Sequence, residues 1–239
     1  MTSSSSSLTP GLWSGADRTD RVLWGISVAC GIVYLFLASS IPYPLRVVVK
    51  ALPLGTMAVI AFRRRGTMAK PREASLLGAA LSFSCLGDIF LALRGDYFVQ
   101  GLSSFLVAHL TYIALFTKNW QRPLRPRPVR LAQSVTILLY SLFFSQWLAL
   151  SLGKLAAPVM LYVCAITIMV VSSLWANFKS PWIGIGAILF LISDSIIAAG
   201  KFKMDVPYGA FLIWATYYLG QYGIAFGFMR EKSGESGNR

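Results

Sequence analysis

Long apolar stretches recur along almost the whole of this sequence and limit the folds that it can adopt. The chain has 239 residues, of which 56% are hydrophobic and only 13% are charged. Soluble domains carry about 25% charged residues, so this composition is typical of a protein that crosses a membrane several times. An apolar helix of roughly 20 residues spans the hydrocarbon core of a bilayer. The sequence therefore predicts an all-α, polytopic membrane protein.

Eight such segments follow one another, separated by short polar connections. They cover residues 22–40, 45–62, 74–93, 99–117, 131–150, 156–176, 182–200 and 208–229. We expect a single membrane domain of eight transmembrane helices over residues 21–230. A disordered polar tail at 1–20 precedes it, and a polar C-terminal tail at 231–239 follows. The first tail lacks the apolar core of a signal peptide.

The distribution of basic residues predicts the orientation of the chain. Eight spans place both termini on one side of the membrane, together with the connections that follow 45–62, 99–117 and 156–176. That side holds most of the basic residues, namely Arg18, Arg21, Arg63, Arg64, Arg65, Lys70, Arg72, Lys118, Arg122, Arg125, Arg127, Arg130, Lys179, Arg230, Lys232 and Arg239. Cytoplasmic loops are enriched in Lys and Arg, so we predict cytoplasmic termini, in the plasma or inner membrane if the source is bacterial. The net charge of +13 indicates contact with anionic lipid at these loops, and no nucleic-acid partner.

Two carboxylates interrupt the apolar segments. Asp88 lies within 74–93 and Asp194 within 182–200, and the whole chain has only nine acidic residues. A charged side chain in hydrocarbon costs about 2.5–3.5 kcal/mol on insertion scales, so such residues face the protein interior and usually mark a functional site. In the predicted orientation, Asp88 lies about 9 Å and Asp194 about 12 Å below the outer face of the hydrocarbon core.

The segments 74–93 and 182–200 also resemble each other. Each carries its Asp in the second half and is followed by an outer loop with a further acidic residue, Asp96 or Asp205. Both segments cross the membrane in the same direction. A duplicated four-helix unit is therefore one hypothesis for the architecture.

Other polar residues fall in the same outer layer. Lys50, His109 and Tyr217 lie at depths similar to those of the two acids, which indicates a shared polar cavity that opens outward. Lys50 either extends to the outer face or acts as counter-ion for an Asp or a lipid phosphate. Tyr112, at i+3 from His109, is a candidate hydrogen-bond partner. Gln221 shares one helix face with Tyr217, at i+4.

The content of histidine and cysteine argues against a metal site. The chain has one histidine, and its three cysteines, Cys30, Cys85 and Cys164, all fall in apolar segments. A multi-histidine zinc site is impossible with this set. We read the cysteines as small buried residues without a disulfide framework.

A series of short motifs extends over residues 45–228. The motifs are Lys50-Ala51-Leu52-Pro53, Gly87-Asp88, Tyr97-Phe98 with Gly101 and His109, Ile192-Ser193-Asp194, and Thr216-Tyr217-Tyr218 with Gln221. In this order they resemble the lysoplasmalogenase family, the YhhN-like eight-span membrane proteins. The resemblance implies hydrolysis of the vinyl ether bond of a lysoplasmalogen to a fatty aldehyde and glycerophosphoethanolamine or glycerophosphocholine. It implies no metal and no organic cofactor.

The resemblance also implies roles for individual residues. Asp88 and Asp194 would form the catalytic pair. The residues expected to bind the lysophospholipid are Lys50, His109, Tyr112, Tyr217 and Gln221. Vinyl ether hydrolysis starts with protonation of the β-carbon and needs a second group that stabilises the oxocarbenium ion or activates water. We expect one acid to donate the proton and the other to handle the water, with either assignment open.

Other functions also use carboxylates in membranes. An intramembrane aspartyl protease fits poorly, because Cys85-Leu86-Gly87-Asp88 lacks the first glycine of the usual Gly-x-Gly-Asp motif and Asp194 follows a serine instead of a tyrosine. A proton-coupled transporter would use the acids and His109 as a proton relay, although obvious pairs of broken helices are missing. A purely structural membrane protein is the remaining alternative.

Overall fold

The computed structural model describes residues 17–68, 70–120 and 127–236, with side chains up to residue 231. Within these ranges the chain forms eight α-helices and two short 3-10 turns, and no β-strand. The helices are α1 (Arg18–Leu37), α2 (Leu45–Arg63), α3 (Pro71–Ala92), α4 (Phe98–Lys118), α5 (Pro128–Ala149), α6 (Ala156–Trp175), α7 (Pro181–Phe202) and α8 (Gly209–Ser236). The prediction of an all-α fold is confirmed, with one helix for each apolar segment.

The helix ends follow local signals in the sequence. α1 begins after Asp17, whose carboxylate accepts a hydrogen bond from the Asp20 N–H. α3, α5 and α7 each begin with a proline, whose missing N–H breaks no helical bond at that position. Helix extends into both stretches expected as polar tails, since α1 starts at Arg18 and α8 reaches Ser236. The rest of those tails, 1–16 and 237–239, lies outside the described residues.

Seven of the eight helices, α1 to α7, are long and apolar enough to cross a membrane. The protein is therefore an integral membrane protein. Among the helices described, α8 does not reach that level of hydropathy, because Gln221, several tyrosines and several glycines interrupt its apolar residues. The same helix buries Tyr217, Gln221 and Phe228. Its polar groups thus face protein rather than lipid.

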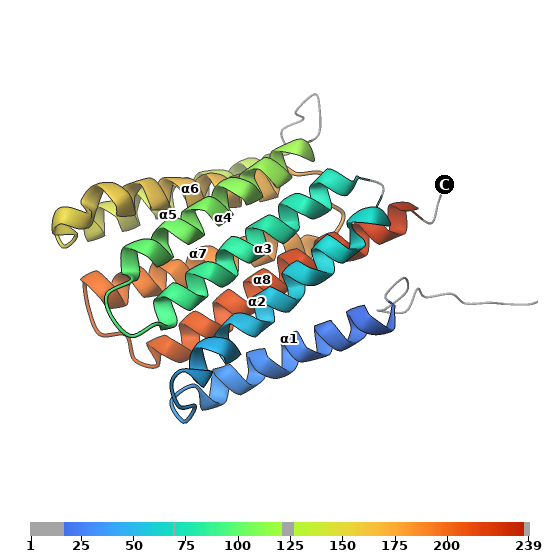
Figure 1. Cartoon of the computed structure of the whole chain (residues 1–239). Coiled ribbons are helices and arrows are strands. Elements are labelled where there is room, and N and C mark those ends of the chain that lie inside the picture. The colour runs from blue at the N-terminus through green and yellow to red at the C-terminus, as the bar shows by residue number, and fades with distance from the viewer. Residues whose placement is uncertain (1–16, 69, 121–126, 237–239) are drawn as a thin grey trace, which may run out of the picture.

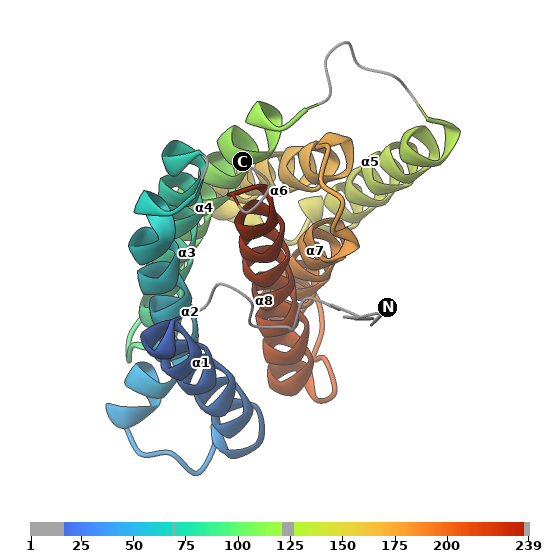
Figure 2. The same cartoon turned by 90° about the vertical axis from the view of Figure 1, so that its right-hand side faces the viewer.

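The helices form a bundle of antiparallel neighbours (Figure 1). The start of α1 and the end of α8 lie at the same end of the molecule (Figure 1). Figure 2 shows α8 between one group of helices, α1 to α4, and another, α5 to α7. α8 packs most extensively on α7 and also contacts α1 and α2, while α4 packs on α6. The central helix can therefore present side chains to both groups.

Two glycines bring α7 and α8 close together. A Cβ added at Gly220 would lie 2.8 Å from the carbonyl oxygen of Gly186, and one added at Gly186 would clash with the carbonyl of Gly220. Small residues allow such close packing of helices in membranes. Gly220 directly precedes Gln221 and lies three residues after Tyr217, so this contact fixes the position of both side chains relative to the acid on α7.

Charged side chains connect helices at the end of the bundle where α1 starts and α8 ends. Asp20 of α1 is buried and accepts hydrogen bonds from Arg63 at 3.3 Å and from Arg64 at 2.7 Å. At the same end of the bundle, the Glu231 carboxylate of α8 accepts from the backbone N–H groups of Lys179 and Ser180, just before α7. These contacts join the first helix to the second, and the last helix to the seventh.

Candidate active site

Asp88 lies on α3 in a buried ion pair. Its side chain is only 2% exposed, and its Oδ1 lies 3.6 Å from Nζ of Lys50 on α2. The Tyr217 hydroxyl of α8 donates to Oδ2 at 2.7 Å. Of the two roles considered for Lys50, the structure thus places it as the counter-ion of an Asp, with 14% of its side chain exposed. A charge inside a membrane protein is normally paired in this way.

Asp194 lies on α7 in a second polar group. Its Oδ2 accepts a short hydrogen bond from the Tyr162 hydroxyl of α6. Nε2 of His109, on α4, lies 2.9 Å from the Tyr162 oxygen and 3.5 Å from the same carboxylate oxygen. The Tyr162 hydroxyl has one hydrogen, which it gives to Asp194, so its oxygen accepts from His109. The result is a chain of hydrogen bonds from His109 through Tyr162 to Asp194.

A third polar group links α3, α4 and α8. The Tyr112 hydroxyl donates to Oε1 of Gln221 at 2.7 Å, and Nε2 of Gln221 donates to the Ser84 hydroxyl at 3.0 Å. The expected pairing of Tyr112 with His109 is therefore wrong. Positions three apart on a helix differ by about 60° around its axis, so Tyr112 reaches α8 while His109 reaches α6.

An aromatic cluster connects the surroundings of the two acids. The rings of Phe105, Phe190 and Tyr217 pack edge to face, with centroids 5.2 to 6.1 Å apart. The Phe190 ring also contacts His109, at 4.8 Å between centroids. These rings lie between the hydrogen-bonded groups of the two acids. Of the residues expected in a shared polar cavity, Asp194 lines one cavity and Lys50 another.

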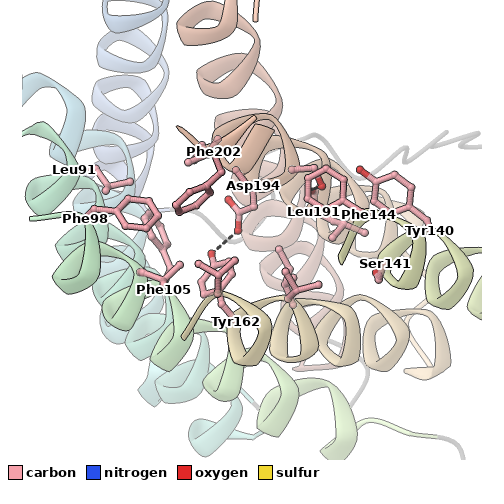
Figure 3. Close-up of a pocket in the computed structure, with 17 residues that line it drawn as sticks. Leu91, Phe98, Phe105, Tyr140, Ser141, Phe144, Tyr162, Leu191, Asp194 and Phe202 are labelled. Atoms are coloured by element: carbon pink, nitrogen blue, oxygen red, sulfur yellow. Dashed lines mark hydrogen bonds between the residues drawn. The ribbon is translucent and has the colours of Figure 1, made fainter. Parts of the chain in front are cut away.

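Asp194 lines an apolar cavity between α4, α5, α6 and α7 (Figure 3). The space that a water-sized molecule can enter amounts to about 50 Å³, within about 640 Å³ of unoccupied space that includes space open to the surroundings. Most of its lining residues are apolar, namely Leu91, Phe98, Leu102, Phe105, Phe144, Val159, Val163, Ile166, Leu191, Ile197, Ala198 and Phe202. Asp194 is hydrogen-bonded to Tyr162 at the wall (Figure 3). Apolar cavities with a few placed polar groups are typical of ligand sites.

One oxygen of Asp194 remains without an internal partner. Oδ2 is held by Tyr162 and faces His109, whereas Oδ1 accepts no hydrogen bond from any residue that the structure describes. The side chain is 10% exposed. The carboxyl group is therefore positioned by one oxygen and can meet a ligand with the other.

A second, more open cavity lies beside Lys50. Its residues include Tyr34, Ser39, Lys50 and Trp214, and it has about 1080 Å³ of unoccupied space, part of it open to the surroundings. Asp88 lines neither cavity. Leu91 and Ile197 line both cavities. They follow Asp88 and Asp194 by three residues, one helical turn, on the same helix faces.

The surroundings of the two acids are in contact, because the Tyr217 ring, whose hydroxyl holds Asp88, packs on Phe190, which in turn contacts His109 beside Asp194. The structure thus brings Asp88 and Asp194 to one region of the bundle, but only Asp194 borders the apolar cavity. Lys50 borders the second cavity. His109, Tyr112, Tyr217 and Gln221 are at most 4% exposed and line neither.

Tyr162 is a site residue that the sequence interpretation missed. It lies six residues after the start of α6, or about 9 Å at the helical rise, which in the predicted orientation is the depth calculated for the acids. Extending the depth calculation to every tyrosine would have found it. No sequence pattern marks the apolar cavity, because its residues are of the same apolar types as the side chains that face lipid.

The fold and the site together define a class, an all-helical integral membrane protein with carboxylates buried among its helices. The profile of the YhhN family matches residues 45–228, and the chain belongs to this family. The matched range is the same as the range over which the motifs extend, residues 45–228. No solved structure matches the chain.

Several curated relatives share the similarity. The lysoplasmalogenase of Mycobacterium bovis is 35% identical over 161 residues, which are 66% of this chain and 61% of the relative. Lysoplasmalogenase TMEM86A of Homo sapiens is 31% identical over 209 residues, 82% of this chain and 83% of the relative. Human lysoplasmalogenase TMEM86B is 31% identical over 156 residues, which are 65% of this chain and 64% of the relative. The alignment thus spans less than two thirds of the mycobacterial relative.

Proposed function

We propose that this protein is a membrane-bound lysoplasmalogenase. It hydrolyses the vinyl ether bond of a lysoplasmalogen to a fatty aldehyde and glycerophosphoethanolamine or glycerophosphocholine. The observation that carries the proposal is the carboxyl group of Asp194 on an apolar cavity, oriented by Tyr162 and His109. Relatives named lysoplasmalogenase, 35% and 31% identical, support it.

The two cavities suggest how the lipid lies. The alkenyl chain occupies the apolar cavity, and the glycerophosphate extends toward the cavity that Lys50 lines. The vinyl ether then lies over Leu91 and Ile197, next to the turn that carries Asp194. Of the residues expected to bind substrate, Lys50 contacts the phosphate side. The other four, His109, Tyr112, Tyr217 and Gln221, hold the acids and α8 in place.

The reaction follows from the chemistry of vinyl ethers. The protonated Asp194 carboxyl gives its proton to the β-carbon, and the substrate becomes an oxocarbenium ion. The Asp194 carboxylate then takes a proton from a water molecule that attacks the α-carbon. The resulting hemiacetal collapses to the aldehyde and the free glycerol hydroxyl, so one water is consumed for each bond broken.

Asp88 contributes through its charge. The ion pair with Lys50 and the hydrogen bond from Tyr217 favour its carboxylate form and fix its position. A fixed negative charge near the developing cation stabilises the transition state, because the surrounding medium has a low dielectric constant. In this mechanism Asp194 is the acid and base, and Asp88 is the electrostatic partner.

We further propose that all eight helices span the membrane, with both termini in the cytoplasm and the basic loops against anionic lipid. In support, the polar groups of α8 are buried, and the start of α1 and the end of α8 lie at the same end of the bundle (Figure 1). A duplicated four-helix unit is supported by packing, since the successive contacts of α1 to α4 recur among α5 to α8.

A proton-coupled transporter is the second candidate. It is favoured by the hydrogen-bonded chain from His109 to Asp194, which could pass protons. Transport would appear as proton-dependent uptake into proteoliposomes without product formation. The helices that carry the two acids, α3 and α7, continue unbroken past both residues, which is unlike the broken helices of many transporter sites.

Aldehyde release decides between these functions. The purified protein is incubated with alkenyl, alkyl and acyl lysophospholipids that share one head group. We expect aldehyde from the alkenyl lipid only. Release from none of the three lipids would refute the proposal.

A further inference from the structure

Two aliphatic side chains line both cavities at the site. Leu91, on the last turn of α3, and Ile197, on α7, are the residues that line both the apolar cavity and the cavity beside Lys50. Both are only partly buried. A molecule that extends from one cavity into the other must pass over this pair, which we call the partition.

The position of Leu91 depends on a motif glycine. A Cβ added at Gly101 of α4 would lie 2.7 Å from Cδ2 and 2.9 Å from Cγ of Leu91. The Leu91 side chain therefore fills the hollow that the missing Cβ leaves on α4. Gly101 is one of the residues that carry the family resemblance, and the proposed reaction does not otherwise use it.

From this arrangement we infer that the partition selects lipids without an acyl chain at the sn-2 position. The inference rests on the proposed function. With the alkenyl chain in one cavity and the phosphate toward the other, the glycerol C2 lies two bonds from the ether oxygen and so against Leu91 and Ile197. A hydroxyl at C2 fits beside these side chains. An acyl ester there requires the partition to open.

The size of the effect follows from known discrimination in apolar pockets. One additional methylene changes the specificity constant by about 10- to 200-fold. An acetyl ester in place of the hydroxyl is larger than a methylene. We therefore expect the wild-type protein to prefer the lyso lipid over its sn-2 acetyl derivative by at least about tenfold.

The test compares two lipids and several variants. The lipids are a 1-alkenyl lysophospholipid and the same lipid with an sn-2 acetyl group, and the readout is kcat/KM for aldehyde release. Leu91→Ala and Ile197→Ala should each lower the preference for the lyso lipid by about tenfold, because each removes one side of the partition. Leu86→Ala, on the same helix at a 39% exposed leucine, is the matched control and should keep the wild-type ratio.

A third variant acts in the opposite direction. Gly101→Ala displaces Leu91 from its hollow toward the cavities, so we expect a lower kcat/KM for the lyso lipid and an unchanged or larger preference. If Leu91→Ala does not fold, the inference is tested by the lipid preference of Ile197→Ala and of the smaller change Leu91→Val. An unchanged ratio in the folded partition variants, with normal cleavage of the lyso lipid, overturns this inference and leaves the proposed function standing. Absence of aldehyde from both lipids with wild-type protein overturns both.

Discussion

At the scale of single residues, the two acids differ in how each is held. Asp194 meets the cavity with one oxygen, whereas Asp88 is fully occupied by Lys50 and Tyr217. The two residues should therefore respond differently to the same substitution. Asp194→Asn removes a proton donor, while Asp88→Asn leaves a buried ammonium group without its anion.

For Asp88 we expect a loss of stability as well as of activity. Breaking a buried ion pair on one side costs about 3–5 kcal/mol, whereas replacing both partners by apolar residues is often neutral. Asp88→Leu combined with Lys50→Met should therefore recover most of this loss of stability in detergent, apart from about 1–3 kcal/mol for the Tyr217 hydroxyl left without its acceptor, yet remain inactive. Recovery of activity in the folded double variant would show that the Asp88 charge is not needed.

The Tyr162 hydroxyl offers a second residue-scale test. Tyr162→Phe keeps the ring but leaves Oδ2 of Asp194 and Nε2 of His109 without their shared partner. An unsatisfied buried polar group costs about 1–3 kcal/mol of stability, and we expect kcat to fall as well, because the Asp194 carboxyl is no longer held at the cavity wall. Tyr140→Phe, at another cavity tyrosine that forms no hydrogen bond among the described side chains, is the control. Equal kcat values for the two variants would contradict the role of Tyr162.

At the scale of helices, the site depends on the close contact of α7 with α8. Gly186 faces the backbone of Gly220, whereas a Cβ at Gly184 would meet only a side-chain atom of Leu174, at an ordinary 3.5 Å. We expect Gly186→Ala to lower the unfolding temperature and the activity together, because α8 must move and takes Tyr217 with it. Gly184→Ala should leave both unchanged or raise the unfolding temperature slightly, since Ala is the better helix former by about 1 kcal/mol. Similar unfolding temperatures for the two variants would refute this view of the interface.

The helices also show what the sequence can predict. Asp88, Lys50, Tyr217 and Gln221 could be assigned to the interior, because polar groups in hydrocarbon must find partners. Their actual partners could not be assigned, because a depth along a helix carries no information on which neighbour the side chain faces. For that reason the pairing of His109 with Tyr162 was missed.

At the scale of the whole molecule, the number of helices and the common end for both termini follow from apolar segment length alone. The division of the site into two cavities does not, since it depends on ordinary residues such as Leu91 and Phe105 that take their places only when four or more helices pack together. Hydropathy also ranks α8 below the other helices as a membrane span. The reason is that its glycines and polar residues lower its hydropathy although they lie in the interior.

The orientation of the molecule can be tested on intact cells or sealed vesicles. We expect a cysteine introduced at Lys154, in the exposed turn before α6, to react with an impermeant thiol reagent from outside. A cysteine at Lys179, before α7 at the opposite end of the bundle, should react only after permeabilisation. The reverse pattern would place the termini outside.

The central claim is that Asp194 delivers a proton to carbon, and hydrolysis in deuterated water tests it most directly. Wild-type protein should release aldehyde with one deuterium at C2, the former β-carbon. Asp194→Asn, folded as judged by its unfolding temperature, should release it about 10²- to 10⁴-fold more slowly. Aldehyde without deuterium at C2, or an Asn variant that works at the wild-type rate, would contradict the account.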